Sequence, residues 1–134
     1  MIVVDSSAII ALYLGEPGAA EFAEAIELDA QPILSAASLL ECAIVMRRKK
    51  AAEQGDSDNW LDTFVATAAM AIHPVSADHI TIARQADIQY GKGTGHPAQL
   101  NFGDCFAYAL AKAMDVPLLY KGDDFARTDI ASAL

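Results

Sequence analysis

The stretch Met1-Ile2-Val3-Val4-Asp5-Ser6-Ser7-Ala8 decides the fold. Its apolar run at 2–4 is typical of a short buried strand, and the residues after Asp5 predict the start of a helix. In a parallel sheet with helices on its faces, ligands bind just outside the carboxyl ends of the strands. Asp5 is therefore predicted to lie where such a protein performs chemistry. The alternative is that Asp5 serves only as a helix N-cap, a position that aspartate favours.

The composition indicates a globular domain. A length of 134 residues predicts a single domain over residues 1–134, and 54% hydrophobic with 20% charged residues excludes a disordered chain. No apolar stretch reaches the roughly 18 residues of a membrane span, and no secretory signal is visible. Cys42 and Cys105 lie in apolar helical stretches and are predicted to be buried packing residues rather than a disulfide framework. We therefore predict a cytoplasmic protein with no membrane segment.

The net charge of −9 bears on the choice of partner. A protein that holds nucleic acid mainly by its phosphates is expected to be basic, so the charge taken alone argues against nucleic-acid binding. It leaves open a small acidic site that reaches phosphates through a divalent cation.

Strand-like and helix-like segments alternate along the chain. This alternation predicts an α/β fold with three layers around a mostly parallel central sheet. Further strands are predicted at 32–34, 72–75 and 116–120, and the pattern also accommodates a final short strand at 128–130. The predicted helices cover 19–28, 37–50, 58–71, 77–90 and 103–114, with turns at 54–56 and 122–125.

Two acidic residues stand out inside predicted helices. Glu41 interrupts the apolar run 39–46, and a buried carboxylate is costly unless it is paired or coordinates an ion. The alternative is that Glu41 marks a narrow solvated stripe together with Arg48. Asp104 opens the predicted helix that follows 101–103, although an acid in a first helical turn is favourable in any protein.

Two more acids, Asp123 and Asp124, follow the predicted strand at 116–120, although aspartate is also an ordinary turn residue. If the strand ends converge on one edge of the sheet, these acids join Asp5, Asp104 and Glu41 in one cleft. Carboxylates so close repel unless a cation lies among them, and oxygen ligands without His or Cys suit Mg²⁺ or Mn²⁺. A site of this kind activates a nucleophile in phosphodiester cleavage.

Four segments carry a family resemblance, and they occur in order along the whole chain: 3–8, 38–41, 100–106 and 121–125. Together they resemble the PIN-domain ribonucleases, and above all the VapC toxins of bacterial type II toxin–antitoxin systems. The resemblance implies a three-layer PIN fold and Mg²⁺- or Mn²⁺-dependent endoribonuclease activity on RNA, with transfer RNA the commonest expectation. It also implies a homodimer and inhibition by a VapB antitoxin.

The same resemblance assigns the acids as catalytic and metal-binding residues. The matched positions are Asp5, Glu41, Asp104 and Asp123, with Asp124 as the alternative to Asp123. Ser6 occupies the place of a hydroxyl that can orient a ligand or water. Two other readings stay open: a metal-dependent DNA nuclease of the same fold, and a catalytically silent protein that only binds a partner.

Several basic residues lie near the predicted cleft. Lys92 and His96 flank a glycine-rich loop ahead of Asp104, and Lys121 precedes the last acids. They are candidates for contacts with RNA phosphates, although basic residues are equally typical of loops that only face solvent. The basic run 47–50 either contacts RNA or complements the dipole at a helix C-terminus.

The apolar helices around Leu12, Phe22, Trp60 and Phe64 exceed what a monomer core of this size needs. Part of that surface is a candidate contact for an antitoxin helix or for a second copy of the chain.

Overall fold

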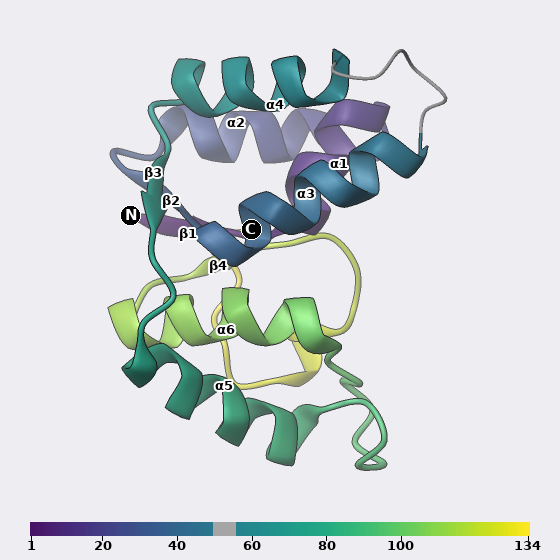
Figure 1. The fold of residues 1–134 in the computed structure, drawn as a ribbon, viewed down its shortest axis with the longest axis vertical. Helices are drawn as coiled ribbons and strands as arrows, with labels where there is room; N and C mark the ends of the chain where they lie inside the picture. The colour runs from purple at the N-terminus through teal and green to yellow at the C-terminus, as the bar shows by residue number, and fades with distance from the viewer. Residues whose placement is uncertain (50–55) are drawn as a thin grey trace.

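The computed structural model describes residues 1–49 and 56–134 (Figure 1). Its centre is a four-stranded sheet in the order β3-β2-β1-β4, and every neighbouring pair is parallel. The strands are short: β1 is Ile2–Val4, β2 is Pro32–Ser35, β3 is Ala71–His73 and β4 is Leu118–Leu119. The register places Val3 beside both Ile33 and Leu118, so β1 lies in the middle of the sheet.

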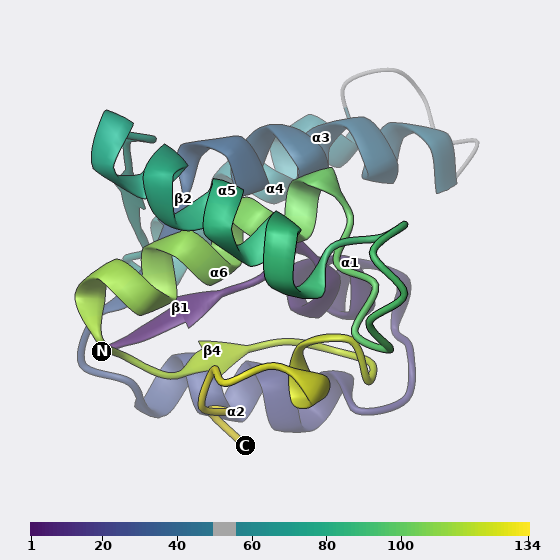
Figure 2. The same cartoon turned by 90° about the horizontal axis from the view of Figure 1, so that it is seen from below.

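Helices connect the strands and cover both faces of the sheet. They are α1 (Ser6–Leu14), α2 (Ala19–Leu28), α3 (Ala36–Lys49), α4 (Asp56–Thr67), α5 (Ala77–Tyr90) and α6 (Phe102–Met114), with a short 3-10 helix at Phe125–Arg127. Figures 1 and 2 show α5 and α6 on one side of the strands and α2 and α4 on the other. The predicted three-layer α/β fold is thus confirmed.

The alternation of side chains along β1 divides the core in two. Val3 is fully buried on the face that α5 and α6 cover, whereas Ile2 and Val4 are buried against residues of α1 to α4. Successive strand residues point to opposite faces, so a strand covered on both sides must be apolar throughout. This is why the run 2–4 carries no polar residue.

The strand order creates the place where a site can form. From β1 the chain proceeds through β2 to β3 in one direction, and β4 then lies on the opposite side of β1. The crevice at the carboxyl end of β1 is therefore the topological switch point, the usual ligand position in open α/β sheets. Asp5 directly follows β1 at this point.

Some predicted boundaries are wrong. The helix predicted over 58–71 begins at Asp56 and ends at Thr67, because Ala69 adopts a left-handed φ of 49° and Ala71 starts β3 beside Ile33. Asp56 is therefore helical rather than part of a turn, and residues 50, 54 and 55 of the predicted elements lie outside the described residues. No strand forms at 128–130; instead Ser132 makes an isolated bridge to Leu118.

Across the two described ranges, no helix has the length and apolar character needed to cross a membrane. Cys42 and Cys105 are both buried free thiols, as predicted.

Candidate active site

Asp5 combines a capping role with an unusual environment. Its Oδ2 accepts a hydrogen bond from the backbone N–H of Ser7 at 3.0 Å, so it caps α1 as the alternative reading expected. The residue is only 2% exposed, and its Oδ1 is buried without a hydrogen-bond partner in the described part of the chain. Burial raises the pKa of Asp5 to about 6. Capping therefore occupies one carboxylate oxygen and leaves the other available to a ligand.

Glu41 reaches the same place from α3. Its Oε1 accepts a hydrogen bond from the Ser6 hydroxyl at the start of α1, and the nearby Glu41 charge contributes to the raised pKa of Asp5. The carboxylate is thus directed at α1 and is half-buried. Ser6 thus contacts one of the predicted acids, and its predicted role in orienting a ligand or water stays a prediction.

Gly103 fixes how closely α6 approaches Glu41, and sequence reasoning did not single it out as a site residue. A Cβ atom added at Gly103 would lie 1.9 Å from Glu41 Oε2 and 2.6 Å from Glu41 Cδ, so any other residue here would displace the Glu41 carboxylate. Only glycine permits this approach. A glycine in the first turn of a predicted helix, directly before an acid, was the available signal.

Asp104 also combines a cap with proximity to other acids. Asn101 Oδ1 accepts from the Asp104 N–H at 2.9 Å, and Asp104 Oδ2 accepts from the Asn101 N–H at 3.0 Å, which completes a capping box at the start of α6. Burial, together with the charges of Asp5, Glu41 and Asp124, raises the pKa of Asp104 to about 7. The charges of three other carboxylates therefore act on Asp104.

The choice between the last two acids is informed by the same effect. Asp124 is the member of the pair whose charge acts on Asp104. The loop that carries it is held near α1, because the Lys121 N–H donates to Ser7 Oγ at 2.9 Å. Both Asp123 and Asp124 are exposed. This charge effect favours Asp124, the alternative candidate, over Asp123 as the fourth acid.

As placed, the acids do not form a finished metal site. Within residues 1–49 and 56–134, no three His, Cys, Asp or Glu side chains converge closely enough to hold one metal ion. Uncompensated carboxylates repel, and Glu41 is engaged by Ser6. The donor set nevertheless suits a hard cation, because it consists of carboxylate oxygens and includes the buried, unpartnered Oδ1 of Asp5.

Two of the predicted RNA contacts have structural partners. The Lys121 ammonium forms an ion pair with Glu16 at 2.7 Å. His96 Nδ1 accepts from the Ala98 N–H at 3.0 Å, and its ring lies edge-on to Tyr90 with centroids 5.0 Å apart. Both residues therefore stabilise loops in the structure. Lys92, by contrast, is exposed on the rim of a groove between α5 and α6.

The basic run at the end of α3 is partly paired. Arg47 donates two hydrogen bonds of 2.8 Å to the Asp58 carboxylate of α4, whereas Arg48 and Lys49 are exposed. Lys50 lies outside the described residues.

The apolar surplus predicted for the helices is confirmed only in part. Phe22 is 5% exposed and belongs to the core, so it is not a surface residue. Trp60 and Phe64 are half-buried on α4 and stack with centroids 5.1 Å apart, while Tyr13 of α1 meets the edge of the Trp60 ring.

The comparison with known families agrees with this geometry. The PIN domain model matches residues 2–131. The chain is 42% identical over 132 residues to Ribonuclease VapC42 of Mycobacterium tuberculosis, covering 98% of both chains. It is 45% identical over 130 residues to Ribonuclease VapC30 of the same organism, covering 97% of this chain and 96% of the relative.

Solved structures share the fold at low sequence identity. Mycobacterium tuberculosis VapC20, described as a Sarcin-Ricin loop cleaving toxin, superposes with a TM-score of 0.78 at 14% identity, over 98% of this chain and 97% of that one. The Rickettsia felis VapBC2 complex bound to a fragment of promoter DNA gives a TM-score of 0.75 at 16% identity, over 98% and 96%.

Proposed function

This chain belongs to the PIN-domain family, with VapC ribonucleases as full-length relatives, and from that premise we propose that it is an endoribonuclease toxin held inactive by a VapB-type antitoxin. The observation that carries the proposal is the buried Asp5 at the switch point of the sheet, whose Oδ1 has no partner among the described residues and whose neighbour Ser6 hydrogen-bonds Glu41. The charges of Asp5, Glu41 and Asp124 also act on Asp104, as expected for one acidic site. The complexes among its structural neighbours support the antitoxin partner.

We propose that the reaction depends on Mg²⁺ or Mn²⁺. Asp5 and Asp104 would hold the ion, with Glu41 and Asp124 as further acids of the site. A bound divalent cation of this kind lowers the pKa of a coordinated water and neutralises charge on phosphate oxygens. The buried and unpartnered Oδ1 of Asp5 supports this assignment, because an orphaned buried acceptor is costly without a ligand.

The remaining residues of the site hold the acids in position. The Ser6 hydroxyl donates a hydrogen bond to Glu41, and the Ser7 N–H holds Asp5 Oδ2, which leaves Asp5 Oδ1 without a partner among the described residues. Asn101 fixes Asp104 through the capping box. Three of the four carboxylates, those of Asp5, Glu41 and Asp104, thus have one oxygen held at the start of α1 or α6, so these three need little rearrangement when substrate binds.

The expected substrate is a structured RNA, with transfer RNA as the first candidate, and the proposed place of action is the cytoplasm, where such RNA is found. We also propose that the chain works as a homodimer. The outer face of α3 supports this, because Leu40 is 59% exposed beside the half-buried Ile44. The Trp60 and Phe64 stack on α4 is the proposed contact for the antitoxin.

The decisive experiment is cleavage by the purified chain of total transfer RNA, ribosomal RNA and single-stranded DNA. It is run with Mg²⁺, with Mn²⁺ and with EDTA. We expect RNA cleavage with either ion and none in EDTA. Asp104→Asn should lose at least about 100-fold in rate, as expected when a group that stabilises the transition state is removed. Asp62→Asn, on the exposed face of α4, is the matched control and should cleave normally.

Two results would overturn the proposal. Cleavage of DNA alone would assign a different nuclease activity. RNA cleavage that persists in EDTA and in the Asp104→Asn variant would show that neither the metal ion nor Asp104 is needed for the reaction. Circular dichroism of each variant separates lost activity from lost folding.

A further inference from the structure

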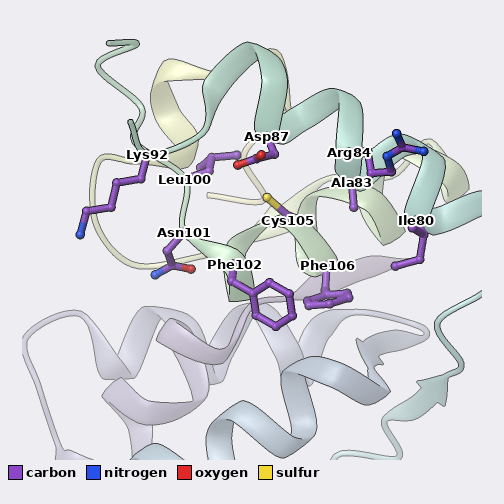
Figure 3. Close-up of a pocket in the computed structure, with 10 residues that line it drawn as sticks. All are labelled: Ile80, Ala83, Arg84, Asp87, Lys92, Leu100, Asn101, Phe102, Cys105 and Phe106. Atoms are coloured by element: carbon purple, nitrogen blue, oxygen red, sulfur yellow. The ribbon is translucent and has the colours of Figure 1, made fainter. Parts of the chain in front are cut away.

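A groove of about 420 Å³ between α5 and α6 opens beside the acidic site (Figure 3). Its floor is apolar and includes Leu100 and Cys105, and its wall includes Asn101, the residue that caps α6 through Asp104. Phe102 and Phe106 line both this groove and a second hollow that Glu41 and Gly103 also line. The groove therefore adjoins the proposed catalytic centre.

An exposed aromatic ring lines this groove. Phe102 is 82% exposed, the largest exposure among the large hydrophobic residues described. Its ring meets Phe106 edge to face with centroids 4.9 Å apart, so Phe106 supports it from one side. A supported aromatic face beside a nuclease site is the usual platform on which an unpaired base stacks.

Two cations lie toward opposite ends of the same groove. Figure 3 shows Lys92 at one end and Arg84 at the other, with Phe102 and Phe106 between them along one wall. Across residues 1–49 and 56–134, the ion pairs engage Arg47, Lys112 and Lys121, whereas Arg84 and Lys92 form none. In a chain of net charge −9, two unpaired cations on one groove provide local complementarity to phosphates.

We propose that this groove binds a nucleotide that flanks the cleaved phosphodiester, with its base stacked on Phe102 and its phosphates near Arg84 and Lys92. This inference rests on the proposed ribonuclease function and narrows its substrate. A base can stack on Phe102 only when it is unpaired, so cleavage is directed to single-stranded loops or ends rather than to duplex RNA.

Binding without cleavage tests the role of Phe102. The probe is a short fluorescein-labelled single-stranded RNA of random sequence, and its affinity for the full chain is measured by fluorescence anisotropy in EDTA. Phe102→Ala should weaken binding by about 5- to 100-fold, the usual loss for one stacked base. Phe102→Tyr should retain affinity because it keeps the aromatic face, and Phe102→Leu should behave as the alanine variant does. Ile88→Ala is the control: Ile88 is also an exposed apolar residue, but it lies on α5 and does not line the groove, so this variant should bind normally.

The salt dependence of binding tests the cations. Arg84→Gln and Lys92→Gln should each reduce the slope of log affinity against log salt by about 0.7, the value for one phosphate contact with a single strand. Lys112→Gln removes a charge near the end of α6 that is paired with Asp129 and does not line the groove, so it should leave the slope unchanged.

Several outcomes would overturn the inference. Normal binding by Phe102→Leu would show that the site needs only an apolar side chain. A change in molecular mass on light scattering of Phe102→Ala would assign the ring to a contact between copies. Unchanged salt slopes for Arg84→Gln and Lys92→Gln would show that neither residue contacts a phosphate. Cleavage of the same RNA by the unmodified chain in Mn²⁺ is measured in parallel. Cleavage without the expected binding losses would contradict only the groove proposal, whereas absence of cleavage would contradict the ribonuclease proposal.

Discussion

Replacing Gly103 by alanine should separate stability from activity. The added Cβ would lie 1.9 Å from Glu41 Oε2, and ordinary contact begins near 3.4 Å, so the carboxylate must move by about 1.5 Å. Glu41 is a flexible side chain and can swing away, which breaks its hydrogen bond with Ser6. Misplacing a catalytic group by about 1 Å can cost about 100-fold in rate. We therefore expect Gly103→Ala to lose about that factor in RNA cleavage.

The stability of this variant should change little. Alanine is favoured over glycine in a helix by up to about 1 kcal/mol, and this gain offsets the displacement of Glu41. The assay is initial-rate RNA cleavage alongside denaturant unfolding, with Glu41→Ala and the double variant completing a cycle. If the loss arises through Glu41, Gly103→Ala should cost nothing further in the Glu41→Ala background. Equal losses in both backgrounds would refute the reasoning.

Three further predictions concern single side chains. In EDTA, Asp5 holds a proton in the folded state up to its pKa of about 6, whereas the unfolded chain releases it near 4, so the free energy of unfolding should fall as pH rises between these values. Asp5→Asn removes this term and should be about 2–3 kcal/mol more stable than the unmodified chain at pH 7.5 in EDTA, yet inactive; denaturant unfolding that shows equal stability would contradict it. Tyr108→Phe loses the hydrogen bond from its hydroxyl to Asp129 and should cost about 1 kcal/mol in urea unfolding, with an unchanged midpoint as the contrary result. Asp124→Asn should reduce RNA cleavage more than Asp123→Asn, and the reverse order would restore Asp123 as the fourth acid.

Local patterns predicted the elements that local forces determine. The helices at 19–28 and 77–90 match their predicted bounds, because their ends carry turn or capping residues: Gly18 precedes one and Ser76 caps the other. The helix predicted over 58–71 ran too far because its alanine-rich end reads as helical. Pairing of Ala71 with Ile33 in the sheet, which no local pattern reveals, ends it earlier.

In the site, too, features set by local sequence were predictable and features set by tertiary packing were not. The position of Asp5 at the carboxyl end of β1 was predictable, because an apolar run followed by a helical stretch marks the end of a strand. The contact between Glu41 and Gly103 depends on how α3 packs against α6, and the ion pair between Lys121 and Glu16 joins segments 105 residues apart. Such contacts follow from tertiary packing and leave no periodic signal in the sequence.

The position of β4 has a consequence for how the chain is made. The hydrogen bond from the Lys121 N–H to Ser7 Oγ joins residues 114 positions apart, and β4 pairs directly with β1. During synthesis, Asp5 is made more than 100 residues before its neighbouring strand β4 and the acids of the 121–125 loop. A nascent chain that still lacks these residues cannot assemble the proposed catalytic centre, so the strand order sets the earliest point at which the proposed activity can arise.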